Sequence, residues 1–300
     1  MSLQSRKTKL LDRSTESFLS SVEKLEGQLH QLVLGILENF DREDGRLIGS
    51  AYNRNQLFQL GRELEDAFAN SRLNRRVQEW VPDFEKLLQL NRQYWNSQGW
   101  SFTDRINEIL SDDMQIRINQ LVSDLTGSGV DVNVIQGLQQ KIQEGIVTRQ
   151  RYSDLKEVVK EYLVTDTRQS QLLRYASVIT QDAINGFDGA IQKVVADEYE
   201  MDGFNYVGSL IKDSRLTCIA LTSAPGKVMV GKNVVPNPYA DLVLPGGAFR
   251  IKDIPKIIER SYNNPGWNKS TTPDTFFIYR GGYNCRHEAL PTMLLESQKK

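Results

Sequence analysis

The residue types best suited to chemistry gather in two short motifs in the last third of the chain. Residues 213–218 read Asp-Ser-Arg-Leu-Thr-Cys, and residues 283–287 read Tyr-Asn-Cys-Arg-His. The motifs contain both cysteines, Cys218 and Cys285, and one of the two histidines, His287. Thiolates and imidazoles act as metal ligands, nucleophiles and proton carriers, and guanidinium groups bind carboxylates or phosphates. Because rare residues in matched motifs commonly meet in a fold, we expect the two motifs to face each other at the centre of a C-terminal domain.

The charged residues of the motifs admit a structural and a chemical interpretation. Asp213, Arg215 and Arg286 are expected to form a buried ion-pair network, since guanidinium binds carboxylate through two parallel hydrogen bonds. The alternative is a phosphate-binding pocket of Arg215, Arg286 and His287, which would suit a nuclease or a transferase acting on nucleic acid. The sequence has neither a convincing Ser-His-Asp constellation nor a Walker A motif. We therefore predict no catalytic residue and no enzyme, with the nucleic-acid enzyme as the alternative.

A second candidate site is a basic and aromatic stretch between Gly247 and His287. It holds seven Lys or Arg residues against three carboxylates, a net charge of +4, with seven aromatic residues interleaved. Cations bind phosphate without reading base sequence, and exposed aromatic rings stack on bases. The alternative places most of the rings in a small core, with the cations as its solvated rim. The residues predicted to bind nucleic acid are Arg250, Lys252, Lys256, Arg260, Trp267 and Lys269.

The elements that must position these residues change character near residue 200. Eight of the nine prolines lie beyond that point. Proline fixes φ and removes a hydrogen-bond donor, so long helices belong before the change and short elements with turns after it. We predict an α+β protein, with a mainly helical region over 1–164, a long connecting helix over 165–200 and a small α+β domain over 201–300.

The first helix is expected over residues 8–40, where apolar residues recur every three or four positions. This seam comprises Phe18, Val22, Leu25, Leu29, Leu32, Ile36 and Phe40. It predicts either the core-facing helix of a bundle, which we prefer, or an intermolecular coiled coil. The connecting helix contains Gly186 and Gly189, which we expect to mark close packing or a kink, because glycine is unfavourable within helices.

Beyond residue 200 the apolar period shortens towards two. Strands are expected over 204–211, 227–230 and 276–279, the last of them buried. An element over 216–221, helical in our interpretation, carries Cys218, and a short helix over 254–262 tolerates Pro255 in its first turn.

The pattern of residues 206–218, closed by residues 283–287, resembles the C-terminal domain of tailed-phage minor head proteins, the Mu F-like head morphogenesis family. In that pattern an aromatic-rich strand precedes an aspartate, an arginine and a cysteine, here Asp213, Arg215 and Cys218. The closing residues match at Asn284, Cys285, Arg286 and His287. The resemblance covers about residues 165–292, less than half of the chain.

The resemblance implies a low-copy minor capsid protein near the portal vertex, acting by binding in head morphogenesis and in the retention or delivery of DNA. Its implied partners are the portal, other capsid proteins and packaged double-stranded DNA, with self-association through the N-terminal helices and no membrane. Its implied location is the virion, at the capsid interior or portal vertex, and the host cytoplasm during assembly.

Further cysteines and histidines in the family suggest a metal site in some members. Here the second cysteine expected after Cys218 is missing, and Cys218, Cys285 and His287 remain, with Asp213 able to complete a set. Structural zinc takes four ligands, so we predict no metal and no cofactor, with zinc at these residues as the alternative. A structural clasp is expected instead, with the cysteines packed as small hydrophobes. The clasp comprises Asp213, Arg215, Cys218, Cys285, Arg286 and His287.

The totals set outer limits on these interpretations. The chain has 300 residues, a net charge of −1 and 39% hydrophobic residues, so it can bury a sizeable core and carries no overall basic coat. No apolar run indicates a secretory signal or a membrane span. Two cysteines are too few for a disulfide scaffold, which fits synthesis in a reducing cytoplasm.

Overall fold

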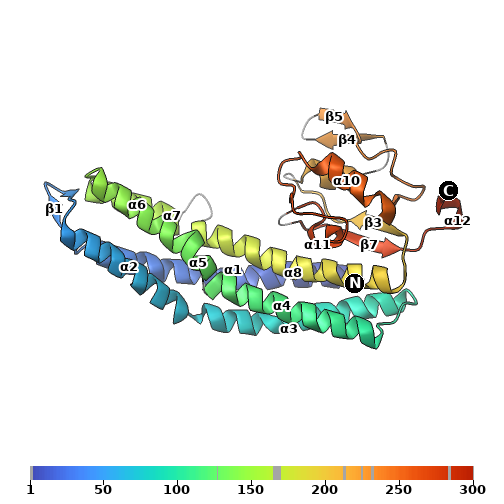
Figure 1. The fold of residues 1–300 in the computed structure, drawn as a ribbon, viewed down its shortest axis with the longest axis horizontal. Helices are drawn as coiled ribbons and strands as arrows, with labels where there is room; N and C mark the ends of the chain where they lie inside the picture. Colours follow the sequence, from blue (N-terminus) through green and yellow to red (C-terminus); the bar gives the residue numbers. More distant parts are fainter. Residues whose placement is uncertain are drawn as a thin grey trace. The chain divides into compact units, whose positions relative to one another are not determined.

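The computed structural model describes residues 3–126, 128–164, 170–211, 214–223, 226–230, 233–282 and 285–299. Helices make up 66% of it, and small sheets follow the N-terminal helices (Figure 1). The predicted α+β class with a mainly helical N-terminal region is therefore confirmed.

The elements before residue 200, where prolines are rare, comprise the long helices and a few short elements. They are α1 (Leu3–Leu37), β1 (Arg42–Glu43), β2 (Arg46–Leu47), α2 (Ala51–Ala69), α3 (Arg72–Ser97), α4 (Asp104–Thr126), α5 (Ser128–Val130), the π-helical η1 (Asp131–Ile135), α6 (Gln136–Val147), α7 (Tyr152–Leu163) and α8 (Gln171–Glu198). Helix α3 runs through Pro82, its single internal proline. Among the described residues, no helix has both the length and the apolarity required to cross a membrane.

The chain divides into two compact units whose members are not consecutive in sequence. Unit 1 contains Met1–Thr8, Phe84–Arg117 and Gln181–Lys300, and unit 2 contains Lys9–Asp83 and Ile118–Thr180. Helices α1, α3, α4 and α8 each contribute residues to both units. The sequence predicted three consecutive segments, whereas the compact units gather segments that are far apart along the chain.

The apolar seam of α1 is buried within unit 2. Phe18, Val22, Leu25 and Leu29 are all buried, and the ring of Phe18 packs against that of Trp80 with centroids 5.5 Å apart. After Leu29 the buried face widens, since Leu32 is only half-buried whereas Val33, Ile36 and Leu37 are buried. An α-helix drifts relative to a seven-residue repeat, which brings new positions into the core. The chain itself covers the seam, so α1 is the core-facing helix of a bundle.

The remaining elements belong to unit 1 and are short. They are β3 (Gly203–Val207), α9 (Leu216–Thr222), β4 (Lys227–Val230), β5 (Asn233–Pro236), β6 (Ala248–Arg250), the 3-10 helix η2 (Ile251–Asp253), α10 (Ile254–Ser261), α11 (Phe276–Tyr279), β7 (Glu288–Thr292) and α12 (Glu296–Lys299). Strand β3 lies between β6 and β7 and pairs antiparallel with both, while β4 and β5 form a separate hairpin. Phe204 faces Phe249 on one side and Pro291 on the other.

The expected strand over 276–279 is wrong, because these residues form the single turn of α11. A short apolar run does not by itself distinguish a strand from a buried helical turn. The backbone N–H of Arg280 donates to the carbonyl of Phe276 and closes the turn. Phe276 and Phe277 are buried against Phe204, with ring centroids 5.5 and 5.8 Å apart. Burial was therefore predicted correctly for Phe276 and Phe277 and wrongly for Tyr279, which is 38% exposed, and the predicted backbone conformation was wrong.

The first predicted strand exists but ends at Val207, and Leu210 and Ile211 are exposed. Gly208 follows with φ +150, and a side chain there would come within 2.6 Å of the His287 ring. The structure confirms the strand over 227–230 and the helices over 216–221 and 254–262 within one residue.

Helix α8 lies against α11 through a glycine (Figure 1). A Cβ on Gly189 would come within 2.8 Å of the Ile278 Cα atom and closer still to the carbonyl of Phe277. The expectation of close packing is thus confirmed at Gly189 of α8, which lies against the backbone of Phe277 and Ile278 in α11. This contact places α8 beside the residues that surround the second motif.

Candidate functional site

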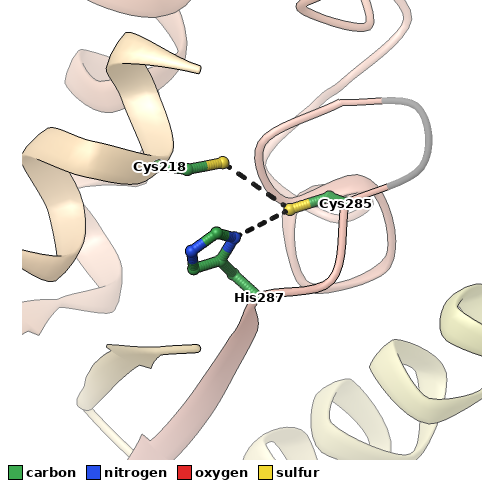
Figure 2. A group of neighbouring side chains, drawn as sticks. All are labelled: Cys218, Cys285 and His287. Atoms are coloured by element: carbon green, nitrogen blue, oxygen red, sulfur yellow. Dashed lines mark hydrogen bonds between the residues drawn. The ribbon is translucent and has the colours of Figure 1, made fainter. Parts of the chain in front are cut away.

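The two motifs meet inside unit 1, at a cluster formed by three elements (Figure 2). Helix α9 supplies Cys218. The segment between α11 and β7 supplies Cys285 and His287, and β3 supplies Tyr206. Figure 2 shows the Cys218 side chain and the His287 ring both directed towards the sulfur of Cys285. The expectation that the cysteines lie side by side is correct.

The cluster is tight and closed to solvent. The Cys285 Sγ atom lies 3.7 Å from the Cys218 Sγ and 3.8 Å from the His287 Nδ1. The hydroxyl of Tyr206 is 3.6 and 3.5 Å from the two sulfurs, and its ring stacks on His287 with centroids 5.6 Å apart. All four side chains are 2–6% exposed. Gly281 permits this approach, since a Cβ there would lie 3.1 Å from Cys285 Sγ and closer to Cys218 Sγ.

The two thiols titrate as a pair. The hydrogen bond with Cys285, followed by burial, raises the pKa of Cys218, whereas the hydrogen bond with Cys218 lowers the pKa of Cys285 in spite of its burial. Burial, followed by the neighbouring sulfurs, raises the pKa of Tyr206 well above its ordinary value. The two sulfurs therefore share a hydrogen bond in which either can be the donor, and Tyr206 remains a protonated phenol.

The same atoms have the chemistry of a metal site. The Cys218, Cys285 and His287 ligand atoms lie within 4.8 Å of one another, and all three residues are buried. Thiolate and imidazole are ligands that zinc and copper prefer. Asp213, the fourth ligand considered from the sequence, lies outside the described residues. The phenol oxygen of Tyr206 lies beside the two sulfurs, at 3.6 Å from Cys218 and 3.5 Å from Cys285.

The charged members of the predicted clasp do not share this interior. Arg215 is half-buried at the start of α9, and Arg286 is exposed although both neighbours in its motif, Cys285 and His287, are buried. The expectation of a buried network that includes Arg286 is therefore wrong.

Sequence reasoning missed a network of buried charges in unit 1. The Asp188 carboxylate is fully buried, and its Oδ1 lies 3.3 Å from the Lys7 ammonium, which also contacts the carboxylate of Glu288. The Arg280 guanidinium is 3.9 Å from Asp188 Oδ2. Two cations thus accompany two carboxylates, which is how buried charges are tolerated.

Neutral side chains and backbone carbonyls extend the network, in which Asp188 Oδ2 and Gln192 Oε1 have no hydrogen-bond partner among the described residues. Asn91 donates to Asp188 Oδ1 at 3.0 Å and accepts from Gln192 at 2.8 Å. Arg280, 2% exposed, donates to the carbonyls of Phe277 at 2.9 Å, of His287 and of Asn185. Through these bonds the guanidinium links α8, α11 and the segment before β7, which also carries Cys285.

One signal in the sequence could have indicated this network. Asp188 lies four residues after Ile184 and three before Ile191, on the apolar face of α8. A carboxylate in an apolar stripe requires a buried partner. The identity of that partner was not accessible, because Lys7 lies 281 residues from Glu288 in the sequence.

The predicted nucleic-acid site is divided between surface and core. Trp267 is 6% exposed and belongs to the core around Phe204, so its ring is not available to stack on bases, and that part of the prediction is wrong. Three rings expected in the core, Phe276, Phe277 and Tyr279, prove to be buried, buried and 38% exposed. The large apolar ring of Trp267 adds more to a small core than to a polar rim.

Three of the predicted cations pair with carboxylates. Arg260 forms a two-pronged bond with Asp241, at 2.6 and 2.9 Å, which lowers the Asp241 pKa. Lys256 lies 2.9 Å and Arg250 4.0 Å from Asp253, and Arg250 also donates to the carbonyl of Gln298. These contacts reduce the positive potential that the count of cations suggested.

Lys252 and Lys269 are exposed, and Lys269 lies 5.3 Å above the ring of Tyr262, itself 46% exposed. This pair combines a cation and an aromatic face at the surface, the combination that favours single-stranded nucleic acid.

No family model matches the sequence, and no match is found among curated proteins or among solved structures. The resemblance to minor head proteins is therefore carried by the motif residues themselves.

Proposed function

We propose that this chain is a minor head protein of a tailed phage, acting by binding in head assembly near the portal and in the retention or delivery of DNA. The observation that carries the proposal is the meeting of the two motifs. Cys218 and Cys285, which define the resemblance, lie 67 residues apart in sequence with sulfurs 3.7 Å apart. Two motifs that build one interior behave as parts of one domain.

Burial favours a binding protein over an enzyme that acts on nucleic acid. A nuclease or transferase must bring its acid-base group to a large substrate, within hydrogen-bond reach of the reacting atom. His287 is 5% exposed and stacked on Tyr206, whereas Arg286 is on the surface. The arrangement supports a role for His287 inside the fold.

The proposed DNA contact rests on a reduced surface. Lys252, Lys269 and Tyr262 replace the larger set expected from the sequence, since Trp267 is buried and Arg260 is paired. Such a surface suits weak binding that declines as salt rises, because each phosphate contact releases counterions.

The proposal is tested by locating the chain in particles. Lysates of the strain that carries its gene would be separated on a density gradient and probed with an antibody to the chain. We expect the chain to sediment with filled heads, at a copy number far below that of the major capsid protein. Exclusive recovery in the soluble fraction, with complete heads formed, would overturn the proposal.

A second assay separates binding from catalysis. Purified chain would be incubated with DNA and RNA, with and without divalent cations. We expect no turnover, and retention of DNA that weakens as salt rises and is reduced in Lys269→Glu. Turnover that disappears in His287→Ala, while His30→Ala keeps it, would favour the enzyme instead.

A further inference from the structure

Several distances in the cysteine cluster are close to those of a metal coordination sphere, and the ligand atoms of Cys218, Cys285 and His287 all lie within 4.8 Å of one another. For a tetrahedral ion with bonds of about 2.3 Å to sulfur and about 2.0 Å to nitrogen or oxygen, sulfur atoms lie about 3.8 Å apart and sulfur lies about 3.5 Å from nitrogen or oxygen. The sulfur–sulfur distance here is 3.7 Å, and the Tyr206 hydroxyl is 3.6 and 3.5 Å from the sulfurs. The distance from Cys285 Sγ to His287 Nδ1 is 3.8 Å.

We propose that Cys218, Cys285 and His287 bind one thiophilic d10 metal ion, Zn²⁺ or Cu⁺, with the phenol of Tyr206 beside it as the fourth group. Two thiolates and an imidazole are soft ligands that select these ions over Mg²⁺ or Ca²⁺. His287 Nδ1 and the Tyr206 hydroxyl both lie close to the Cys285 sulfur, so the cluster offers nitrogen and oxygen donors beside its two sulfurs.

The surroundings of the cluster fit a structural ion. All four side chains are buried, so no position is open to substrate, as in structural zinc sites. Two contacts hold His287 in place, because the Arg280 guanidinium donates to its backbone carbonyl and the Tyr206 ring stacks on its imidazole. Metal-binding histidines commonly donate their second ring nitrogen to an acceptor, whereas His287 Nε2 has no hydrogen-bond partner among the described residues. The ion would join α9 to the segment that enters β7, where each element alone is short.

The test is metal content and its dependence on the ligands. The chain would be purified without chelators, loaded anaerobically with Zn²⁺ or Cu⁺ in separate arms, desalted and analysed by elemental mass spectrometry. We expect about one ion per chain in at least one arm. Cys218→Ser and His287→Ala should lose the ion, while Arg286→Ala and His30→Ala should retain it. Retention of no more metal by the native chain than by Cys218→Ser/Cys285→Ser in both arms would overturn the proposal.

A measurement on the native chain covers the case in which the ligand variants fail to fold. Titration of the loaded chain with an organomercurial should release the ion in step with loss of the two thiols, as reported by a colorimetric indicator. Thiol loss without release of metal would contradict the proposal. Tyr206→Phe separates the arms, because it should weaken a four-coordinate Zn²⁺ site at least about tenfold and leave a three-coordinate Cu⁺ site unchanged.

Oxidation is the competing use of the same sulfurs. The chain purified without reductant would be assayed for free thiols, and the reduced chain for metal binding. Absence of two thiols before reduction, together with binding of neither ion after reduction, would assign the sulfurs to a disulfide and overturn the metal site.

Discussion

At the scale of single residues, the type of a charged side chain did not predict whether the structure buries it. Arg286 lies within the second motif and is exposed, whereas Arg280, five residues from Cys285, is buried and joins three segments. The sequence predicted that Cys218, Cys285 and His287 would come together, because rare types in matched motifs are informative. It did not predict Arg280, Asp188 or Lys7, since burial of a charge is decided by partners distant in sequence.

The contrast between the two arginines yields a stability prediction. Arg280→Ala leaves three buried carbonyls without their donor and Asp188 with less positive charge nearby. We expect a loss of about 3–5 kcal/mol in the free energy of unfolding, the range for breaking a buried pair. The matched variant Arg286→Ala should change it by less than about 1 kcal/mol. Denaturant unfolding of both variants measures this, and equal losses would contradict the assignment.

Lys7 makes stability sensitive to alkaline pH. Burial alone would lower the Lys7 pKa, but Asp188 and Glu288 outweigh it and raise the pKa above its ordinary value of 10.5. A group whose pKa is raised in the folded state contributes its full stabilisation of the fold when the pH is below the pKa of the unfolded chain. This contribution disappears as the pH rises through the pKa of the folded state. The stability difference between the native chain and Lys7→Met should therefore be large near neutral pH and shrink above pH 10.5. A difference that grows with pH would contradict the pairing.

At the scale of elements, periodicity and proline placement predicted most of the long helices, since both act locally. The exception over 276–279 arose because four apolar residues fit a strand and a helical turn equally well. The sequence indicated a close contact of α8 at Gly189, because a glycine within a helix leaves room for a neighbouring segment. Packing partners such as Phe277 were not visible, because they lie far along the chain.

Replacing glycine by alanine should change the stability in opposite directions at Gly189 and at Gly35. Gly189→Ala places a methyl group against the backbone of Phe277 and Ile278, and overpacking should cost about 1–3 kcal/mol. Gly35→Ala, on the exposed face of α1 with no atom within 4 Å of the new Cβ, should stabilise by about 0.4–1 kcal/mol. Thermal unfolding measures both changes. Stabilisation by Gly189→Ala would contradict the close contact between α8 and α11.

The seam of α1 supplies a second comparison within one element. Leu29 is buried and Leu32 is half-buried, although both were predicted to lie on the buried seam. Leu29→Ala should cost about 2–5 kcal/mol, and Leu32→Ala markedly less, because little cavity forms at a partly exposed position. Unfolding in denaturant would show the ranking, and the reverse order would mean that the register of α1 is wrong.

At the scale of the whole molecule, the chain folds as two compact units that share four helices. Composition predicted the change at residue 200, because proline frequency reports local backbone preference. It did not predict that residues 1–8 and 84–117 join the C-terminal part in unit 1, since that grouping depends on long-range burial. The motifs and the charged network both belong to unit 1, which contains every residue of the proposed clasp that the structure describes.

The central claim is that the two motifs build a closed interior rather than a reactive surface. Its most direct test is the rate at which iodoacetamide alkylates Cys218 and Cys285, followed by peptide mass spectrometry in native buffer with a metal chelator present. We predict both thiols to react at least about 1,000-fold more slowly than in the unfolded chain, in step with global unfolding as denaturant is added. Alkylation of either thiol in native buffer at the rate of the unfolded chain would contradict the closed cluster.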